Sequence, residues 1–416
     1  MSNILFLTSV YNYAEKGNLN VDLVDEFAKH GHHITVMTPK ERKYHPEEIV
    51  EYHDNITVLQ FKCLNFRGKV NVIEKGISTL SLGFQYKHAL KKFFSRNSFD
   101  LVIYTTLPIT YSPVIKYIKR QCGAFCYLQQ KDFFPQSAVD LGILKRGSIP
   151  YLLFRRIERR LFTNSDKIGV ISSKNIEFIT NDNPWLSREK VEVCPNGITP
   201  TPENELEIIR HQKSEIRKKY GIPIESVVFL YGGNISRSQG IPFIKSVLSQ
   251  LSETPIKDMF VLIIGNGNEF DGLEKHIREL HSNQIKIMPY MPKAEFDQIL
   301  GTADVGLVFL DSCFTIANIP SRTLAHMDMG QPIVAATDSY TDYRQLIENN
   351  RIGLWCNSSD VGKMIDNMRK MTADVSFRKT CGECARRYLL SSATAEKAYW
   401  VIMKSFNEYM HRAQRQ

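Results

Sequence analysis

Short apolar runs alternate with helical patterns along most of the 416 residues of this chain. In the first half, strand-like apolar runs cover residues 3–9, 33–37, 101–104, 124–128 and 167–171. Loops and helical patterns separate these runs. The order strand–helix–strand predicts parallel strands joined by right-handed crossovers.

The second half repeats this alternation after a polar, charged connection over residues 199–223. Its strand-like runs cover residues 227–231, 260–264, 285–288, 305–309, 333–336 and 353–355. We therefore predict an α/β protein with two Rossmann-like, doubly wound domains, 1–200 and 201–393. A helical pattern over 394–412 ends the chain. In such sheets ligands bind at the carboxyl ends of the strands, and a cleft between two domains is a natural site.

Composition narrows the class of protein. Hydrophobic residues make up 43% and charged residues 23% of the chain, which is ordinary for a soluble globular protein. The net charge of +9 favours anionic partners such as nucleotides, nucleic acid or an acidic membrane surface, without choosing among them. No apolar run reaches the roughly 18 residues that span a bilayer, and no secretory signal is evident.

The eight cysteines are scattered, which indicates a reducing cytoplasm. Cys381 and Cys384 form a lone CxxC pattern without a second pair, so neither zinc nor redox chemistry is expected there. No other spacing suggests a metal site, and we expect no metal and no cofactor.

Residues 318–337 read as a loop, a helix beginning near Ser321, a glycine turn and a buried strand. Ser321 is a candidate N-cap, and the free N–H groups of the first helical turn favour an anion. Arg322 adds a guanidinium fork that suits a phosphate. The alternative is an ordinary βα unit with a capped helix and no ligand.

A glycine-rich turn over residues 231–240 follows a predicted strand. Gly232 and Gly233 let the backbone approach a ligand closely, and Arg237 is the strong cation of the turn. The turn matches neither GxGxxG nor the Walker pattern, which argues against dinucleotide or P-loop chemistry. A plain turn without a ligand is the alternative.

These two segments resemble motifs of family 4 glycosyltransferases, which have the GT-B fold. Residues 318–337 resemble the family's Pro-Ser-Lys and Gly-Lys-Pro-Val-Ile-Ala pattern. Residues 231–240 are similar to the Gly-Asn-Leu-Gly-Arg-Ala-Gln-Gly version found in members that make bacterial surface polysaccharides such as O-antigen, capsule and exopolysaccharide. The resemblance implies that the second domain binds a nucleotide-sugar and the first binds an acceptor, with the final helix packed back on the first domain.

The commoner family pattern has Arg and Lys where this chain has Asn234 and Gln239, which moves the expected phosphate contact to Arg237. By the same resemblance, Asn266 follows a strand near the nucleotide, and Tyr290 and Met291 lie against the base, unless their side chains serve only packing. The resemblance implies the following donor-binding residues: Gly17, Gly233, Asn234, Arg237, Asn266, Tyr290, Met291, Ser321, Arg322 and Thr323.

Residues 129–136 resemble the family's Arg-Asp-Leu-Trp-Pro-Glu segment at the cleft of the first domain. Asp132 is the carboxylate expected to contact an acceptor hydroxyl, unless it caps the following helix. Lys131 is expected to pair with Asp132 or with phosphate. Gly17 and Asn18 fall where the family's first glycine-rich loop meets the donor diphosphate.

The chain also departs from the family. Many members carry two glutamates seven residues apart in the last motif, where this chain has Ala317 and Ala325. The second glutamate normally binds the ribose hydroxyls, so ribose recognition is in question. His326 and Asp328 are nearby, but we expect them to be interior or surface helix residues without a catalytic role.

Two basic, amphipathic stretches fall in the predicted acceptor domain. Over residues 151–162, Leu153, Ile157 and Leu161 recur at helical spacing, and a separate cationic face holds Arg155, Arg156, Arg159 and Arg160. Over residues 66–96, Lys69, Lys75, Lys87, Lys91 and Lys92 lie among apolar residues. Such segments suit an anionic bilayer surface, although both are also consistent with helices packed on the sheet.

With these features, the resemblance implies a cytoplasmic retaining glycosyltransferase, peripheral on the inner face of the membrane. It would move a sugar from a UDP-linked donor to a lipid-linked or glycan acceptor. Arg237 and the N–H groups of 321–323 would stabilise the leaving diphosphate electrostatically, without a metal. Alternatives are a non-catalytic sugar-nucleotide-binding subunit, a phosphorylase of the same fold, and an RNA-binding protein, for which no nucleic-acid signature is present.

Overall fold

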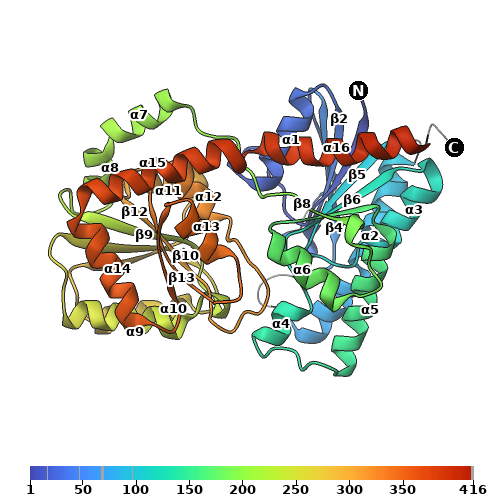
Figure 1. Ribbon diagram of the computed structural model, residues 1–416. Coiled ribbons are helices and arrows are strands. Elements are labelled where there is room, and N and C mark those ends of the chain that lie inside the picture. The colour runs from blue at the N-terminus through green and yellow to red at the C-terminus, as the bar shows by residue number, and fades with distance from the viewer. Residues whose placement is uncertain (16, 46, 67–69, 96, 414–416) are drawn as a thin grey trace. The chain divides into compact units, whose positions relative to one another are not determined.

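The computed structural model describes residues 1–15, 17–45, 47–66, 70–95 and 97–413. The chain divides into two compact units (Figure 1). Unit 1 comprises Met1–Ile198 and Ala395–Gln416, and unit 2 comprises Thr199–Thr394. The two units are described separately.

Unit 1 is built on an eight-stranded sheet in the order β3-β4-β2-β1-β5-β6-β7-β8. In the described residues, β3 and β4 pair antiparallel and the other neighbours pair parallel. The strands are β1 (Asn3–Leu7), β2 (His33–Glu41), β3 (Ile49–His53), β4 (Ile56–Cys63), β5 (Leu101–Thr105), β6 (Phe125–Gln130), β7 (Lys167–Val170) and β8 (Val191–Val193).

Right-handed crossovers place the helices of unit 1 on both faces of this sheet. The α-helices are α1 (Leu19–Lys29), α2 (Val72–Phe94), α3 (Ser112–Cys122), α4 (Gln136–Asp140), α5 (Ile149–Asn164), α6 (Ser173–Asp182) and α16 (Ala395–Ala413). Short 3-10 turns form η1 (Arg42–Tyr44) and η2 (Arg188–Lys190). Gly31 follows α1 with a φ of +79°, a conformation that ends helices readily with glycine.

The C-terminal helix α16 packs on α1 in unit 1 (Figure 1). Phe27 of α1 contacts Tyr399 edge to face, with ring centroids 4.8 Å apart. His30 stacks on the same tyrosine at 4.1 Å. Where the chain enters α16, the Ala395 N–H donates to the Ile198 carbonyl at 3.0 Å, so the two segments that join the units are bonded to each other.

Unit 2 contains a six-stranded parallel sheet in the order β11-β10-β9-β12-β13-β14. Numbered within the unit, this is the 3-2-1-4-5-6 order of a nucleotide-binding Rossmann sheet. Its strands are β9 (Val227–Asn234), β10 (Met259–Asn266), β11 (Ile285–Pro289), β12 (Val305–Phe309), β13 (Ile333–Thr337) and β14 (Gly353–Asn357).

Helices cover both faces of the second sheet and connect its strands. They are α7 (Glu203–His211), α8 (Lys213–Lys219), α9 (Ile241–Glu253), α10 (Phe270–Glu279), α11 (Lys293–Thr302), α12 (Arg322–Asp328), α13 (Tyr343–Asn349), α14 (Val361–Ala373) and α15 (Val375–Ser392), with the 3-10 turn η3 (Arg237–Gln239) after β9. Asp360 and Asp374 cap α14 and α15 by accepting hydrogen bonds from Lys363 and Phe377 N–H groups.

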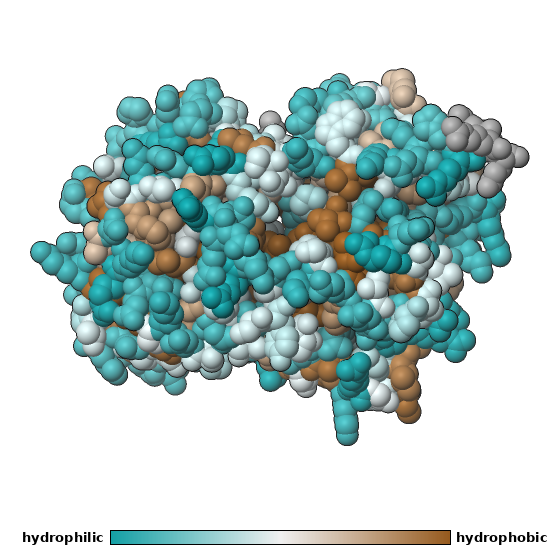
Figure 2. Space-filling view, viewed as in Figure 1, coloured by the Kyte–Doolittle hydropathy of each residue, from teal (hydrophilic) through white to brown (hydrophobic). Residues whose placement is uncertain are grey.

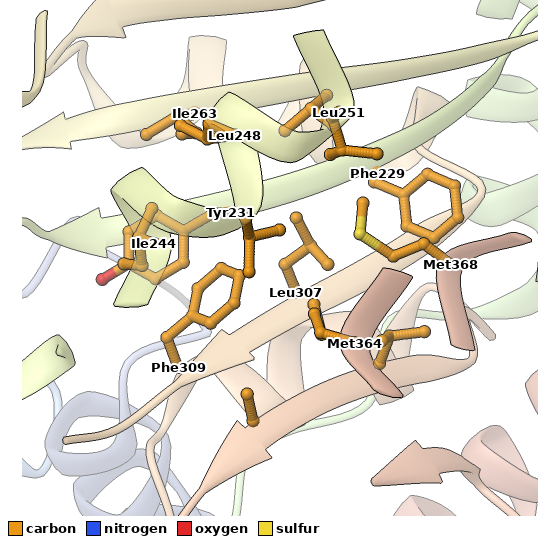
Figure 3. Close-up of a cluster of buried hydrophobic side chains, with 14 of the residues drawn as sticks. Phe229, Tyr231, Ile244, Leu248, Leu251, Ile263, Leu307, Phe309, Met364 and Met368 are labelled. Carbon is orange, nitrogen blue, oxygen red and sulfur yellow. The ribbon is translucent and has the colours of Figure 1, made fainter. Parts of the chain in front are cut away.

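Figure 3 shows the main core of unit 2. Phe229 and Tyr231 of β9 pack beside Leu307 and Phe309 of β12, beneath Ile244, Leu248 and Leu251 of α9 and Met364 and Met368 of α14. The apolar runs of the sequence become strands buried on both faces, as expected of a parallel sheet. This core fixes the carboxyl ends of β9 and β12 relative to each other.

Arg217 of α8 is buried in unit 2, with only 1% of its surface exposed. Its guanidinium donates to the carbonyls of Thr302 (2.7 Å), Ile224 (2.7 Å) and Ser226 (2.9 Å), and to Asp304 Oδ2 (2.6 Å). The group therefore ties α8 to the start of β9 and to the segment between α11 and β12.

Asp304 is the acidic partner of this network. Burial alone would raise the pKa of this carboxyl group, but the cations Lys213 and Arg217 outweigh burial and lower it. Lys213 Nζ donates to Asp304 Oδ1 at 2.6 Å. Asp304 is therefore ionised and paired at neutral pH.

Candidate functional site

The strand order of unit 2 reverses between β9 and β12, which are neighbours although β10 and β11 intervene in the chain. In Rossmann folds the loops that follow two such strands leave in opposite directions, and ligands bind at this edge of the sheet. In this structure the two loops touch: the Asp311 N–H donates to the Ser238 carbonyl at 3.0 Å. The glycine-rich turn and Arg322 thus belong to one site.

Gly232 and Gly233 end β9 within this site. Gly233 has a φ of +133°, and a Cβ atom there would lie 3.4 Å from Arg322 Nε. A Cβ atom on Gly232 would lie 2.3 Å from the ring of Phe296. Gly232 therefore leaves room for the ring of Phe296, and Gly233 adopts a φ that favours glycine where the backbone lies close to the Arg322 guanidinium.

Two side chains hold the Arg322 guanidinium. Its Nη1 donates to Gln239 Oε1 at 2.6 Å, and its central carbon lies 4.7 Å from the ring centroid of Tyr231. The Tyr231 hydroxyl donates to the Asn234 carbonyl at 2.7 Å, and burial raises the pKa of that hydroxyl. Arg322 is therefore pre-organised, because both the stacking surface and the hydrogen-bond acceptor are fixed.

Arg237, the predicted phosphate contact, lies exposed in η3 on the same turn as Gln239. Its guanidinium forms no ion pair with any residue that the structure describes. Asn234 is also exposed, and its Nδ2 donates to Ser236 Oγ at 3.0 Å. The site thus presents two cations: Arg322 of α12, which two side chains hold, and Arg237 of the turn, which has no ion-pair partner among the described residues.

The ends of β10 and β11 bring further predicted residues to this edge of the sheet. Asn266 is exposed beside Asn234 in the neighbouring strand, and its carbonyl accepts the Ile235 N–H at 2.6 Å. Tyr290 is 63% exposed after β11, so packing does not explain this side chain. Met291 packs against the second hydrophobic core of unit 2, as the packing interpretation predicted.

The prediction that the Ser321 side chain caps α12 is wrong. Ser321 precedes the helix but forms no side-chain cap hydrogen bond, and the helix has only 7 residues. The Thr323 N–H donates to the Pro320 carbonyl at 3.0 Å, and the Thr323 side chain is buried against Tyr343. Thr323 is therefore a structural residue, because its donors already have partners inside the protein.

His326 and Asp328 are interior residues, as the sequence analysis expected. Asp328 accepts hydrogen bonds from the Thr201 N–H (2.9 Å) and hydroxyl (2.6 Å), and it pairs with Arg386. His326 Nδ1 lies 2.7 Å from Gln331 Oε1. Because Gln331 Nε2 donates to the carbonyls of α11, its oxygen is the acceptor here and His326 Nδ1 is the donor.

We expect the burial of His326 to make the protein less stable in mild acid. Burial lowers the pKa of His326 from 6.5 to about 4, so the unfolded chain takes up a proton that the native state excludes. Stability is then full above about pH 6.5 and falls towards pH 4. Between pH 7 and pH 5 this group should lower the free energy of unfolding by about 2 kcal/mol.

Urea unfolding at both pH values measures this effect. The variant His326→Gln should lose this part of the pH dependence, whereas His211→Gln, on the surface of α7, should retain it. An unchanged pH dependence in His326→Gln would show that other groups are responsible.

Unit 1 has a corresponding switch point between β1 and β5. Asn20, near the start of α1, donates from Nδ2 to Thr8 Oγ1 at 2.9 Å. Lys131 Nζ donates to Asn20 Oδ1 at 3.1 Å, so the lysine is held by an amide rather than by Asp132. Thr8 and Asn20 were missed in the sequence, although Thr8 lies at the end of the first predicted strand and directly follows β1.

Asp132 is exposed beside this cluster. Its N–H and that of Lys131 both donate to Thr106 Oγ1, at 3.0 and 2.9 Å. Asp132 does not cap α4, which begins at Gln136 with no side-chain cap. The carboxylate is therefore available to an acceptor hydroxyl.

Gly17, Asn18 and Gln130 complete this edge of the sheet in unit 1. Gly17 has a φ of +72°, and its N–H donates to Asp22 Oδ1 at 2.9 Å. Asn18 is the N-cap of α1, accepting the Asn20 N–H, which is a structural role. Gln130 is fully buried, and its Oε1 has no hydrogen-bond partner among the described residues.

The arginines of α5 separate into two kinds. Arg155 is not part of a free cationic face, because it pairs with Glu158 and with Asp182 Oδ2. Arg156, Arg159 and Arg160 are exposed. The predicted apolar stripe is not the buried face: Leu161 is buried, Ile157 is half-buried and Leu153 is 45% exposed. Lys69 of the second basic stretch lies outside the described residues.

The described residues contain neither a cluster of metal ligands nor a membrane-spanning helix. No three or more His, Cys, Asp or Glu side chains lie together in a way that would hold a metal ion. No helix is both long and apolar enough to cross a membrane. Cys381 is buried, and neither it nor Cys384 forms a disulfide.

The arrangement in unit 2 suits a diphosphate. Exposed backbone at a glycine turn, the restrained Arg322 guanidinium and the exposed Arg237 guanidinium lie at the carboxyl edge of a Rossmann sheet. Electrostatic stabilisation at such a site assists departure of a phosphate leaving group.

Comparison with known proteins supports this chemistry. Residues 17–201 match the family described as Glycosyltransferase Family 4, and residues 212–388 match Glycosyl transferases group 1. WbjE of Pseudomonas aeruginosa, named as a glycosyltransferase, is 24% identical over 316 residues, covering 74% of this chain and 75% of its own. WcaI of Escherichia coli K12, named for glycosyl transfer in colanic acid biosynthesis, is 22% identical over 351 residues, covering 80% and 82%.

Among solved structures, HepE of Anabaena in complex with UDP and glucose has a TM-score of 0.70 at 13% identity, covering 98% of this chain and all of its own. This likeness shows the fold. The two family matches together span both units and the candidate residues at both switch points. The chain is a glycosyltransferase enzyme with the GT-B fold and belongs to family 4 of that class.

Proposed function

We propose that this enzyme transfers a sugar, with retention of anomeric configuration, from a UDP-linked donor to a lipid-linked or glycan acceptor in bacterial surface polysaccharide synthesis. The observation that carries the proposal is the Arg322 guanidinium, fixed by Gln239 and Tyr231 at the switch point of unit 2. The name of WcaI refers to colanic acid biosynthesis, which supports a surface polysaccharide as the product. HepE was solved with UDP and glucose, which supports uracil as the base of the donor nucleotide.

In the proposed reaction the bond between the anomeric carbon and the diphosphate oxygen breaks. The acceptor hydroxyl oxygen forms the new bond on the same face of the sugar, and its proton passes to the departing diphosphate. Arg322 and Arg237 stabilise the charge that develops on the diphosphate, and no metal is required for that stabilisation. Asp132 and Lys131 in unit 1 position the acceptor.

Binding of nucleoside diphosphates to the full chain tests the donor class. We expect UDP, at about 100 times its Kd, to stabilise the protein by about 2.7 kcal/mol, visible as a rise of several degrees in the melting temperature. ADP and GDP should give a smaller rise. No stabilisation by UDP would overturn the choice of donor, and an inverted anomeric centre in the product would overturn retention.

The proposal also places the enzyme on the inner face of the cell membrane, where lipid-linked acceptors are found. Its positive net charge of +9 is consistent with that surface.

A further inference from the structure

Helices α2, α3 and α5 lie side by side in unit 1 (Figure 1). Side chains of these helices line an open groove of about 1460 Å³, here called the α3–α5 groove. All residues that line it belong to unit 1. Its cationic lining includes Lys87, Lys116, Arg120, Arg156, Arg159 and Arg160. No Asp or Glu lines the groove, among the residues that the structure describes.

These cations are not neutralised within the protein. Arg155, which also lines the groove, differs from them because it forms ion pairs with Glu158 and Asp182. In the described part of the chain, the six cations named above have no carboxylate partner. Like charges concentrated in a concave surface produce a positive potential that attracts a phosphate group.

Aromatic rings contact several cations at this groove. Lys87 Nζ lies 5.5 Å from the ring centroid of Tyr117, and Lys91 Nζ lies 5.0 Å from it. The Arg159 guanidinium lies 4.9 Å from the ring of Trp185. The rings hold the cations at the groove wall without removing their charge, and one face of each ring is thereby covered.

Exposed aliphatic side chains adjoin the groove at the start of α5. Ile149 is 84% exposed, Leu152 is 57% exposed and Leu153, which lines the groove, is 45% exposed. Ile143, in the preceding loop, is 69% exposed. Figure 2 shows brown, hydrophobic residues protruding at the lower edge of unit 1, where α4 and α5 lie in Figure 1. A basic groove next to projecting aliphatic groups matches a lipid interface.

We propose that the α3–α5 groove binds the phosphate headgroup of an anionic lipid, while Ile149 and Leu152 enter the acyl boundary. The inference rests on the proposed function and deepens it, because it names the surface by which unit 1 meets the membrane. A nucleic acid fits less well: its bases would need free aromatic faces, and the projecting isoleucine and leucine side chains would have no role.

Flotation of the full chain with vesicles tests this site. We expect binding to phosphatidylcholine vesicles that contain 30% phosphatidylglycerol, little binding to pure phosphatidylcholine, and loss of binding at high salt. The variant Arg156→Glu/Arg160→Glu should bind about 30-fold more weakly or worse, since each cation near such a surface contributes about fivefold. Ile149→Ser should weaken binding about tenfold at all salt concentrations.

The matched control is Lys379→Glu/Arg387→Glu, on the exposed face of α15 in unit 2, which changes the net charge equally. It should bind vesicles like the unmodified protein. Stabilisation by UDP is measured on every variant, so that loss of folding or of donor binding is distinguished from loss of lipid binding. If both double variants bound vesicles equally weakly, the groove would not be the lipid site. The proposal would also be overturned if the unmodified protein bound RNA but no vesicles, and only the groove variant lost the RNA binding.

Discussion

Replacing Arg322 by alanine is expected to lower kcat/KM for sugar transfer by about 10²–10³-fold, the usual effect of removing one pre-organised donor to a developing anionic charge. Arg322 is fixed by Gln239 at 2.6 Å and by the ring of Tyr231 before any ligand arrives. The change removes the charge without disturbing the core, because the side chain is half-exposed. The measurement is steady-state transfer from UDP-sugar. Arg278→Ala, on the surface of α10, is the control and should be neutral.

Gln239 provides a sharper form of the same experiment. The commoner pattern of the family that this turn resembles has a lysine at this position, whereas here a neutral amide accepts a hydrogen bond from Arg322. Gln239→Lys alone should lower activity, because an ammonium group would face the guanidinium and the hydrogen bond would be lost. Gln239→Lys combined with Arg322→Ala should recover about tenfold over Arg322→Ala alone. Full activity in the single Arg322→Ala variant would show that this guanidinium does not contact the leaving group.

The largest effect on stability is expected from Arg217→Met. The variant leaves the carbonyls of Thr302, Ile224 and Ser226 without a donor inside the protein and removes one partner of Asp304. Breaking a buried charge network in this way costs about 3–5 kcal/mol, which is a large part of the stability of a domain. Urea unfolding followed by circular dichroism measures the change.

Arg210→Ala is the matched control for this prediction. Arg210 pairs with Glu203 on the surface of α7, where the arginine side chain is 54% exposed, and such pairs contribute about 0–1 kcal/mol. If Arg217→Met unfolded at the same urea concentration as Arg210→Ala, water would satisfy the carbonyls around position 217 in the variant.

Much of the fold could be predicted because parallel strands are buried on both faces and appear as apolar runs between loops. The α/β class and the two doubly wound sheets are confirmed. The strands β3, β4 and β8 were missed. In β4 the buried positions change phase, because Ile56 and Val58 alternate and then Leu59 and Phe61 do, with polar neighbours between them. The edge strand β3 has no fully buried residue, so it does not appear as an apolar run.

The site was less predictable than the fold. The turn over residues 231–240 and the segment containing Arg322 both follow predicted strands, and this position was enough to select them as candidate ligand sites. It could not show that Gln239 accepts a hydrogen bond from Arg322, since 83 residues separate them and only the parallel pairing of β9 with β12 brings them together. The prediction that Ser321 caps α12 failed for a local reason: the Thr323 and Leu324 N–H groups already donate to the carbonyls of Pro320 and Ser321.

The substitution of an amide for an amine at position 239 has a chemical consequence. Both candidate cations at the switch point of unit 2, Arg237 and Arg322, are guanidinium groups, which keep their charge in alkaline solution where amines lose theirs. Acylating reagents that consume lysine should therefore leave this edge of the sheet intact, whereas dicarbonyl reagents that condense with arginine should inactivate it, and bound nucleotide should protect against them.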